Sequence, residues 1–470
     1  MGTARGRSRR HVTAPYDPRA PRGGGFLAAR DDFLAGRDTP RDYLERHLAV
    51  IAARENEVRA FTVLDTEGAS AAADAAAARY RQGSPLSPVD GLPVALKDIF
   101  EVAGLPTTWG IPKKAQVAWR DAAIVHALRK GGAVILGKTT LPELGFGQPA
   151  ATTNPWDAAR SPGGSSSGSA AEVGAGMVPV AIGTQGKGSL TRPASFCGCS
   201  AFKPGHGTIH RGGDGGGQET NTHVGVLAHR PGDAWAVARY LSDVAGPHPG
   251  HRGMDGPAEP PPALMPKMLV RLTATGWDRT DGATRAAFDA LIDGLARAGV
   301  TVAGADELPG TRALARDLDA AALALDVIAD YESRWPLIMY LEQEKAAPTG
   351  AYSERVVARG LERGAATRAE YHEALAFRDA FRAMLDSCRA DWLFLFTPSA
   401  TGPAPMGTGD TGSSVYQWGS SLAGNPVVSL PLMAVDGMPL GLEMQGFARG
   451  EADLMAAALA LDEGFADGRF

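Results

Sequence analysis

The sequence predicts a single large α/β domain with a central mixed sheet covered by helices on both faces. Helical and strand patterns alternate along the chain, as where residues 122–130 lead into 133–136. The strand-like runs are apolar throughout, which is typical of sheets buried on both faces. With 470 residues, 44% of them hydrophobic and 21% charged, the chain can form a sizeable core.

The first half of the domain begins with a helix over about residues 39–58. Thr39 is a suitable N-cap, Pro40 suits the first helical position, and apolar residues then recur at helical spacing. Further elements follow in order: an Ala-rich helix at 69–82, a buried strand at 91–99, a helix at 122–130 and a strand at 133–136.

The second half alternates in the same way around a long helical region at about 314–385. Other helices are expected at 231–244, 281–298 and 452–466, and strands at 268–272, 301–302 and 391–397. Two hairpin arms, 427–432 and 440–445, flank Asp436 and Gly437. No internal repeat or linker divides residues 27–470, so we expect one domain there.

Composition and the N-terminus exclude several classes of function. A net charge of −5 gives no reason to expect nucleic acid or an anionic membrane as a partner. Residues 1–26 are rich in Arg, Gly and Pro, and we expect a flexible tail without a secretory signal. No run approaches the roughly 18 apolar residues of a membrane span.

The cysteine content favours a reducing cytoplasm, because three cysteines are too few for a disulfide framework. Cys197 and Cys199 lack a second pair to complete a tetrahedral metal site. His206 and His210 lack the glutamate of a zinc-binding helix. We therefore expect neither a metal nor a cofactor.

Lys97 interrupts an otherwise apolar strand, where a charged lysine is costly to bury. Either its ammonium pairs with Asp98 or another carboxylate at the strand end, or desolvation holds it neutral and able to accept a proton. The strand by itself leaves both interpretations open.

Two loops rich in glycine and serine lie close together at residues 163–169 and 183–189. The first lacks the Gly-Lys-Ser/Thr ending of a phosphate-binding loop, and its apolar flanks argue against a flexible linker. The second can present backbone N–H groups around Ser189, which is what an oxyanion hole requires.

These stretches resemble the amidase signature family of serine hydrolases. Its pattern runs Gly-Gly-Ser-Ser-(Gly/Ser)-Gly-Ser, then Gly-Thr-(Asp/Gln)-Thr-Gly-Gly-Ser, then Pro-Ala-x-Phe-Cys-Gly and x-Lys-Pro. The chain follows it at residues 163–169, 183–189, 193–198 and 202–204, with further likeness at 91–98 and 424–441. The resemblance covers nearly everything after about residue 27, has its core at about 90–205 and implies the amidase signature fold.

The resemblance also implies a Ser–Ser–Lys triad. By motif position Ser189 is the nucleophile, Ser165 the bridging serine, Lys97 the terminal base and Ser166 a supporting residue. Since a serine hydroxyl needs a base, Ser165 can pass the Ser189 proton to a neutral Lys97. The implied oxyanion hole consists of the backbone N–H groups of Gly186, Lys187, Gly188 and Ser189.

The implied activity is hydrolysis of a small or medium carboxamide through an acyl-enzyme, with a small-molecule amide as the partner. The sequence leaves open whether the chain forms a homodimer. Candidate pocket residues are Trp109, Phe146, Gln148 and Lys187, with Trp335 and Tyr340 from the helical region. Lys187 departs from the family pattern. Its side chain either points to solvent or pairs with an acid, or it meets an anionic or electron-rich part of the substrate or narrows the acyl pocket. Glu172 is either the ion-pair partner of Lys187 or an exposed charge on a helix.

Three alternatives remain open at this point. The chain can be the glutaminase subunit of a tRNA-dependent amidotransferase, which shares the signature. It can be an acyl transferase or esterase that uses the same triad with another acceptor. It can also be a catalytically silent binding protein, although the intact Lys97, Ser165 and Ser189 argue against this.

Overall fold

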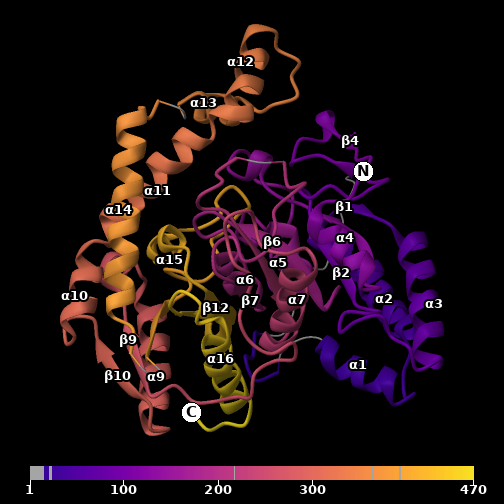
Figure 1. The fold of residues 1–470 in the computed structure, drawn as a ribbon, viewed down its shortest axis with the longest axis horizontal. Helices are drawn as coiled ribbons and strands as arrows, with labels where there is room; N and C mark the ends of the chain where they lie inside the picture. Colours follow the sequence, from indigo (N-terminus) through magenta and orange to yellow (C-terminus); the bar gives the residue numbers. More distant parts are fainter. Residues whose placement is uncertain (1–14, 21–23, 216, 363–364, 391–392) are drawn as a thin grey trace, which may run out of the picture.

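The computed structural model describes residues 15–20, 24–215, 217–362, 365–390 and 393–470. Within this part of the chain an eleven-stranded mixed sheet crosses the molecule (Figure 1). In spatial order its strands are β1 (Phe61–Leu64), β5 (Val134–Thr139), β2 (Pro93–Lys97), β6 (Val180–Gln185), β8 (His223–Ala228), β7 (Ser200–Lys203), β12 (Val427–Val435), β13 (Met438–Gln445), β11 (Leu393–Pro398), β9 (Met268–Arg271) and β10 (Thr301–Gly304).

The pairing of three parallel strands positions the site. Strand β2 lies between β5 and β6 and runs parallel to both, with Leu96 opposite Lys138 and Ile182. The carboxyl ends of β2 and β6 therefore meet at one edge of the sheet, which is where α/β proteins commonly bind ligands. Lys97 ends β2 there and Gln185 ends β6.

Helices cover both faces of the sheet. They are α1 (Phe26–Leu34), α2 (Pro40–Val58), α3 (Thr66–Arg81), α4 (Ala123–Lys130), α5 (Ser167–Gly174), α6 (Thr191–Cys197), α7 (Pro231–Val244), α8 (Ala274–Trp277), α9 (Gly282–Arg297), α10 (Pro309–Arg316), α11 (Leu318–Glu332), α12 (Met339–Ala346), α13 (Glu354–Glu362), α14 (Arg368–Ser387), α15 (Trp418–Ala423) and α16 (Glu451–Ala466).

Alternate residues of β6 enter different hydrophobic cores, as expected from the twofold side-chain repeat of a strand. Val180 and Ile182 pack with residues of α4, α7 and α16 on one face. Ala181 packs with residues of α2, α3 and α5 on the other. The two-face coverage predicted from the apolar strand runs is confirmed.

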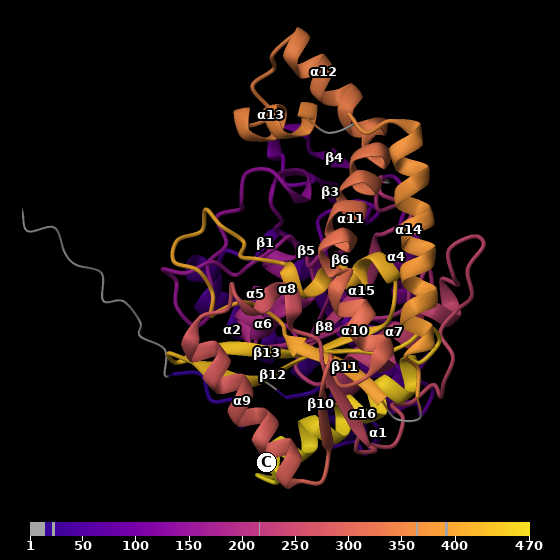
Figure 2. The same cartoon turned by 90° about the vertical axis from the view of Figure 1, so that its left-hand side faces the viewer.

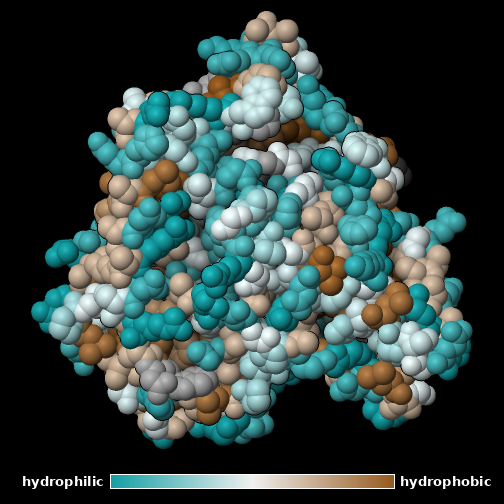
Figure 3. Space-filling model, in the orientation of Figure 1, coloured by the Kyte–Doolittle hydropathy of each residue, from teal (hydrophilic) through white to brown (hydrophobic). Residues whose placement is uncertain are grey.

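A third core lies where α10, α11, α14 and α15 pack beside β9 and β11. Helices α11 and α14 run side by side from the sheet toward α12 and α13, which project from the body in both views (Figures 1 and 2). In Figure 3, hydrophobic residues lie in a hollow below this projecting segment. The helical region predicted at 314–385 corresponds to α10–α14.

Several elements agree closely with prediction, and others were missed. Helix α7 begins and ends where expected, and β12 and β13 form the predicted antiparallel hairpin. The stretch at 163–169 is only partly a loop, because α5 begins at Ser167. Its small residues let this helix lie fully buried, and such a helix has no amphipathic pattern to reveal it. The first two residues of the strand predicted at 391–397 lie outside the described residues.

The expected tail is described only in part, since residues 1–14 and 21–23 lie outside the described residues. Tyr16 within it is buried, donates a 2.6 Å hydrogen bond to the Pro431 carbonyl and packs edge-on against Trp156. The chain near Tyr16 is therefore anchored to the hairpin. Among the described helices, none combines the length and apolarity that crossing a membrane requires.

Candidate active site

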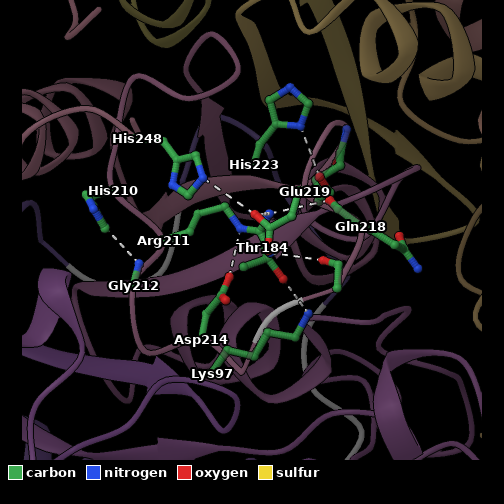
Figure 4. Close-up of polar contacts among 12 residues, drawn as sticks. Lys97, Thr184, His210, Arg211, Gly212, Asp214, Gln218, Glu219, His223 and His248 are labelled. Carbon is green, nitrogen blue, oxygen red and sulfur yellow. Dashed lines mark hydrogen bonds and ion pairs between the residues drawn. The ribbon is translucent and has the colours of Figure 1, made fainter. Parts of the chain in front are cut away.

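Lys97 lies at the carboxyl end of β2, and its side chain is buried within the sheet edge. Its Nζ donates a 2.7 Å hydrogen bond to Oγ of Ser165. A second, 2.9 Å hydrogen bond from Nζ goes to Oγ1 of Thr184 (Figure 4). The three residues come from β2, the first Gly-Ser loop and β6. The structure thus joins the lysine to the serine expected to bridge it to the nucleophile.

Burial lowers the pKa of Lys97 to about 7, and the negative charge of Asp214 opposes this shift. The suggested pairing of Lys97 with Asp98 does not occur. Asp98 instead forms a fully buried ion pair with Lys138, with Nζ and Oδ1 2.6 Å apart. Lys97 is therefore available to exchange a proton near neutral pH.

Ser165 and Ser166 begin the turn into α5, and the peptide bond between Gly164 and Ser165 is cis. Ser166 connects the two loops. Its Oγ exchanges two 3.3 Å hydrogen bonds with the backbone of Thr184, and its N–H donates a 3.0 Å hydrogen bond to the Ser189 carbonyl. Its role as a supporting residue of the site stays a prediction.

The close approach of the two loops requires a glycine at position 183. A Cβ there would lie 2.6 Å from Oγ of Ser166, which is shorter than real contacts allow. Gly183 thus lets β6 pack directly against the first loop. The rest of the 183–189 stretch therefore reaches the site next to that loop.

The loop at residues 186–189 connects β6 to α6 and is fixed from two sides. Oε1 of Gln185 accepts 3.1 Å hydrogen bonds from the backbone N–H groups of Leu190 and Thr191. The Ser421 hydroxyl donates a 2.6 Å hydrogen bond to the Lys187 carbonyl. These contacts orient the peptide groups on either side of Ser189.

Ser189, Ser165 and Lys97 line one cleft with a volume of about 1010 Å³. This is large enough for a small or medium organic substrate. The candidate pocket residues Trp109, Phe146, Lys187, Trp335 and Tyr340 also line it. Gln148 is not among the residues that line the cleft; it is exposed, and its carbonyl accepts a 2.9 Å hydrogen bond from Glu143 N–H.

Lys187 forms an ion pair with Asp326 of α11, across the cleft from its own loop. The expectation that it points to solvent or pairs with an acid is thus met by Asp326. Both expectations for Glu172 were wrong. Glu172 is fully buried on α5, and neither of its carboxylate oxygens has a hydrogen-bond partner in the described structure. Burial raises its pKa well above the usual value.

Sequence reasoning missed Thr184, Ser421 and Asp214. Thr184 stands inside the matched 183–189 stretch, so its motif position was a usable signal. Ser421 is 234 residues from Lys187 along the chain, and no local pattern connects the two. Asp214 lies in the glycine-rich stretch at residues 205–217, which carries no family motif, yet it is buried.

Cysteine and histidine residues near the site take part in packing. Cys197 and Cys199 are buried, and burial raises the pKa of both thiols. Nε2 of His206 lies 3.0 Å from the Glu219 carbonyl. Across the described ranges no group of three or more His, Cys, Asp or Glu side chains is arranged to hold a metal ion.

Residues 42–455 match the Amidase family model, and the chain belongs to this family. It is an enzyme of the class that acts on carbon–nitrogen bonds of amides. It is 31% identical to a glutamyl-tRNA(Gln) amidotransferase subunit of Chloroflexus aggregans, with 91% of this chain and 93% of that protein covered.

Two further proteins have a similar degree of sequence identity to this chain. AtzE of Pseudomonas sp., which belongs to a 1-carboxybiuret hydrolase, is 30% identical, with 92% of this chain and 97% of that protein covered. A solved structure described as a vestigial protein complex bearing on the origins of an s-triazine catabolic enzyme superposes with a TM-score of 0.80, at 28% identity, covering 94% of this chain and 99% of that one. The amidase signature fold expected from the sequence is confirmed.

Proposed function

We propose that this chain hydrolyses a small or medium carboxamide through an acyl-enzyme on Ser189, with Ser165 and Lys97 as its proton relay. The observation that carries this is the 2.7 Å contact between the buried Nζ of Lys97 and Oγ of Ser165. A lysine whose pKa is about 7 can both take and return a proton at neutral pH.

In the first half-reaction, Oγ of Ser189 bonds to the amide carbon while its proton passes to Ser165 and the Ser165 proton passes to Lys97. Negative charge then builds on the former carbonyl oxygen. The N–H groups of residues 186–189 stabilise it, and each such donor is typically worth about 3 kcal/mol. Returning the proton through the relay to the leaving nitrogen breaks the C–N bond and releases the amine.

In the second half-reaction, water attacks the Ser189 ester and gives its proton to the same relay. Collapse of the tetrahedral intermediate releases the carboxylic acid and restores the Ser189 hydroxyl. Every proton moves between groups of the cleft, the substrate and water, so this chemistry needs no cofactor.

A screen of an amide library with the parent and Ser189→Ala tests the function. We expect Ser189→Ala to abolish turnover and Ser165→Ala to reduce it severely. Thr153→Ala is a matched control, because Thr153 is buried but lies outside the residues that line the cleft. Parent-like turnover by Ser189→Ala would overturn the assignment of the nucleophile.

A second candidate is the glutaminase subunit of a tRNA-dependent amidotransferase, favoured by the 31% identity to the Chloroflexus aggregans amidotransferase protein. Such a subunit would depend on partner chains. Activity of the purified chain on simple amides counts against this candidate, whereas glutaminase activity that appears only with a partner supports it. Product analysis with added amines or alcohols separates hydrolysis from acyl transfer.

A further inference from the structure

Arg211 and Asp214 form a buried ion pair inside the active-site cleft. Nε of Arg211 lies 2.8 Å from Oδ2 of Asp214, and only 5% of each side chain is exposed. Both residues line the cleft that contains Lys97, and Figure 4 shows the Asp214 carboxylate directed toward Arg211, with Lys97 on the other side of Asp214 in this view. Nothing in the proton relay of Ser189, Ser165 and Lys97 uses this pair.

The surrounding backbone holds the pair in place. The Arg211 guanidinium donates hydrogen bonds to the carbonyls of Gly217, at 3.2 Å, and Gln218, at 3.4 Å. Between the two charged residues, the Gly212 carbonyl accepts a 2.8 Å hydrogen bond from Ala123 N–H and the Gly213 carbonyl accepts a 2.9 Å bond from Glu101 N–H. A buried ion pair with this support is a fixed element of the cleft wall.

Asp214 supplies the negative charge that acts on Lys97. Other charged groups around Lys97 are engaged elsewhere: Lys138 of β5 pairs with Asp98, Lys187 of the 186–189 loop pairs with Asp326, and Arg192 of α6 donates to the carbonyls of Gly164 and Gly412. The largely exposed Glu219 lies 3.4 Å from Nη1 of Arg211. Burial keeps the pKa of His223 of β8 well below its usual value and raises the pKa of Glu172 of α5. Asp214 is therefore the charged group that acts on Lys97, and Arg211 is the cation paired with Asp214.

We propose that Asp214 is a positioning residue whose carboxylate, held and partly neutralised by Arg211, sets how readily Lys97 takes a proton from Ser165. The role rests on the function proposed above and goes beyond it. Burial alone favours the uncharged amine, which would make Lys97 a weaker base. A nearby carboxylate restores proton affinity, and the arginine limits how far it does so.

Opposite shifts in the pH profile of kcat/KM test this role. The activity should have an acid limb, because Lys97 must be uncharged to accept a proton. Asp214→Asn removes the negative charge, so the midpoint of the limb should move to lower pH by about one pH unit. Arg211→Gln exposes Lys97 to the full charge of Asp214, so the midpoint should move to higher pH.

Asp214→Glu keeps the charge and should restore the parent midpoint. Asp157→Asn is a matched control, because Asp157 forms an Asp–Arg pair of the same three-residue spacing with Arg160 outside the cleft lining. Rates of Ser189 modification by a fluorophosphonate, measured across pH, give a second readout without substrate. If Asp214→Asn does not fold, Arg211→Gln still carries the test.

A parent-like midpoint in either folded variant would overturn the role of Asp214. The proposed function has a separate test, since activity in Ser189→Ala would remove the relay itself. A retained Ser189 requirement with unshifted midpoints would therefore reject Asp214 alone.

Discussion

Nζ of Lys97 lies 2.7 Å from Oγ of Ser165, although the two residues are 68 positions apart in the chain. The parallel pairing of β2 with β6 and the packing of α5 behind them produce this contact. A lysine at the end of a buried strand and a serine at the start of a buried helix thereby become one proton path. Changes to this path and to the residues around it should have measurable effects.

Replacing the base should remove most of the activity. We expect Lys97→Ala to lower kcat/KM by roughly 10²–10⁴-fold, which is the usual contribution of a positioned base. Steady-state kinetics at neutral pH check this, with circular dichroism to show that the variant folds. Full activity in Lys97→Ala would rule out the relay.

The parent enzyme should lose activity as the pH falls through about 7, because burial lowers the pKa of Lys97 to about 7 and only its uncharged form accepts a proton. The pH profile of kcat/KM measures this midpoint. Burial also lowers the pKa of Lys203 to about 7, but Lys203 is outside the residues that line the cleft. A limb that moves in Asp214→Asn is assigned to Lys97.

Thr184→Val should lower kcat about fivefold and leave KM nearly unchanged. The substitution removes the 2.9 Å hydrogen bond that helps orient Lys97, and one such bond is worth about 1 kcal/mol. Thr153→Val, at another buried threonine, serves as the control. Equal losses in both variants would mean that the effect is one of packing.

Lys187→Gly should lower the preference for carboxylate-bearing over neutral amides by less than about threefold, since the Asp326 charge that it leaves unpaired is largely exposed and screened by solvent. Asp326→Asn frees the cation and should favour the carboxylate-bearing amides. Ratios of kcat/KM for matched amide pairs measure both effects. A large change in Lys187→Gly would instead indicate that Lys187 contacts the substrate.

Glu172→Gln should stabilise the protein, and more at pH 8 than at pH 5. Burial raises the pKa of Glu172 in the folded state, so the folded state holds this proton at pH values where the unfolded chain has lost it. Stability contributed by the protonated form is therefore lost as the pH rises above the usual value of 4.5.

Calorimetry at the two pH values measures this difference, with an expected gain in Tm on the order of 2 °C at pH 8. The exposed Glu373→Gln provides the control. A gain in Glu172→Gln that is the same at both pH values would show that the carboxyl group of Glu172 does not titrate as burial requires.

The sequence was informative where chemistry is local. The Gly-Ser motifs place Ser165, Ser166 and Ser189, and the apolar run around Lys97 indicates that it is buried. Helix α7 and the β12–β13 hairpin could be predicted because periodicity and turn residues determine them. The helix α5 could not, since a helix of small residues buried on every side lacks the usual pattern.

Contacts between segments far apart in the chain could not be predicted from the sequence, for a different reason. Asp326 was not recognised as the partner of Lys187, 139 residues away, because only the packing of α11 against the cleft creates the pair. Glu172 looked like a surface charge, since glutamate is rarely buried without a partner. Asp214 was hidden in a glycine-rich loop whose burial depends on its docking to Glu101 and Ala123.

The most direct measurement is to label the protein with a fluorophosphonate and locate the adduct by peptide mass spectrometry. We expect a single modified residue, Ser189, with labelling lost in Ser189→Ala and strongly slowed in Lys97→Ala. An adduct on another serine, or equal labelling of Ser189→Ala and the parent, would contradict it.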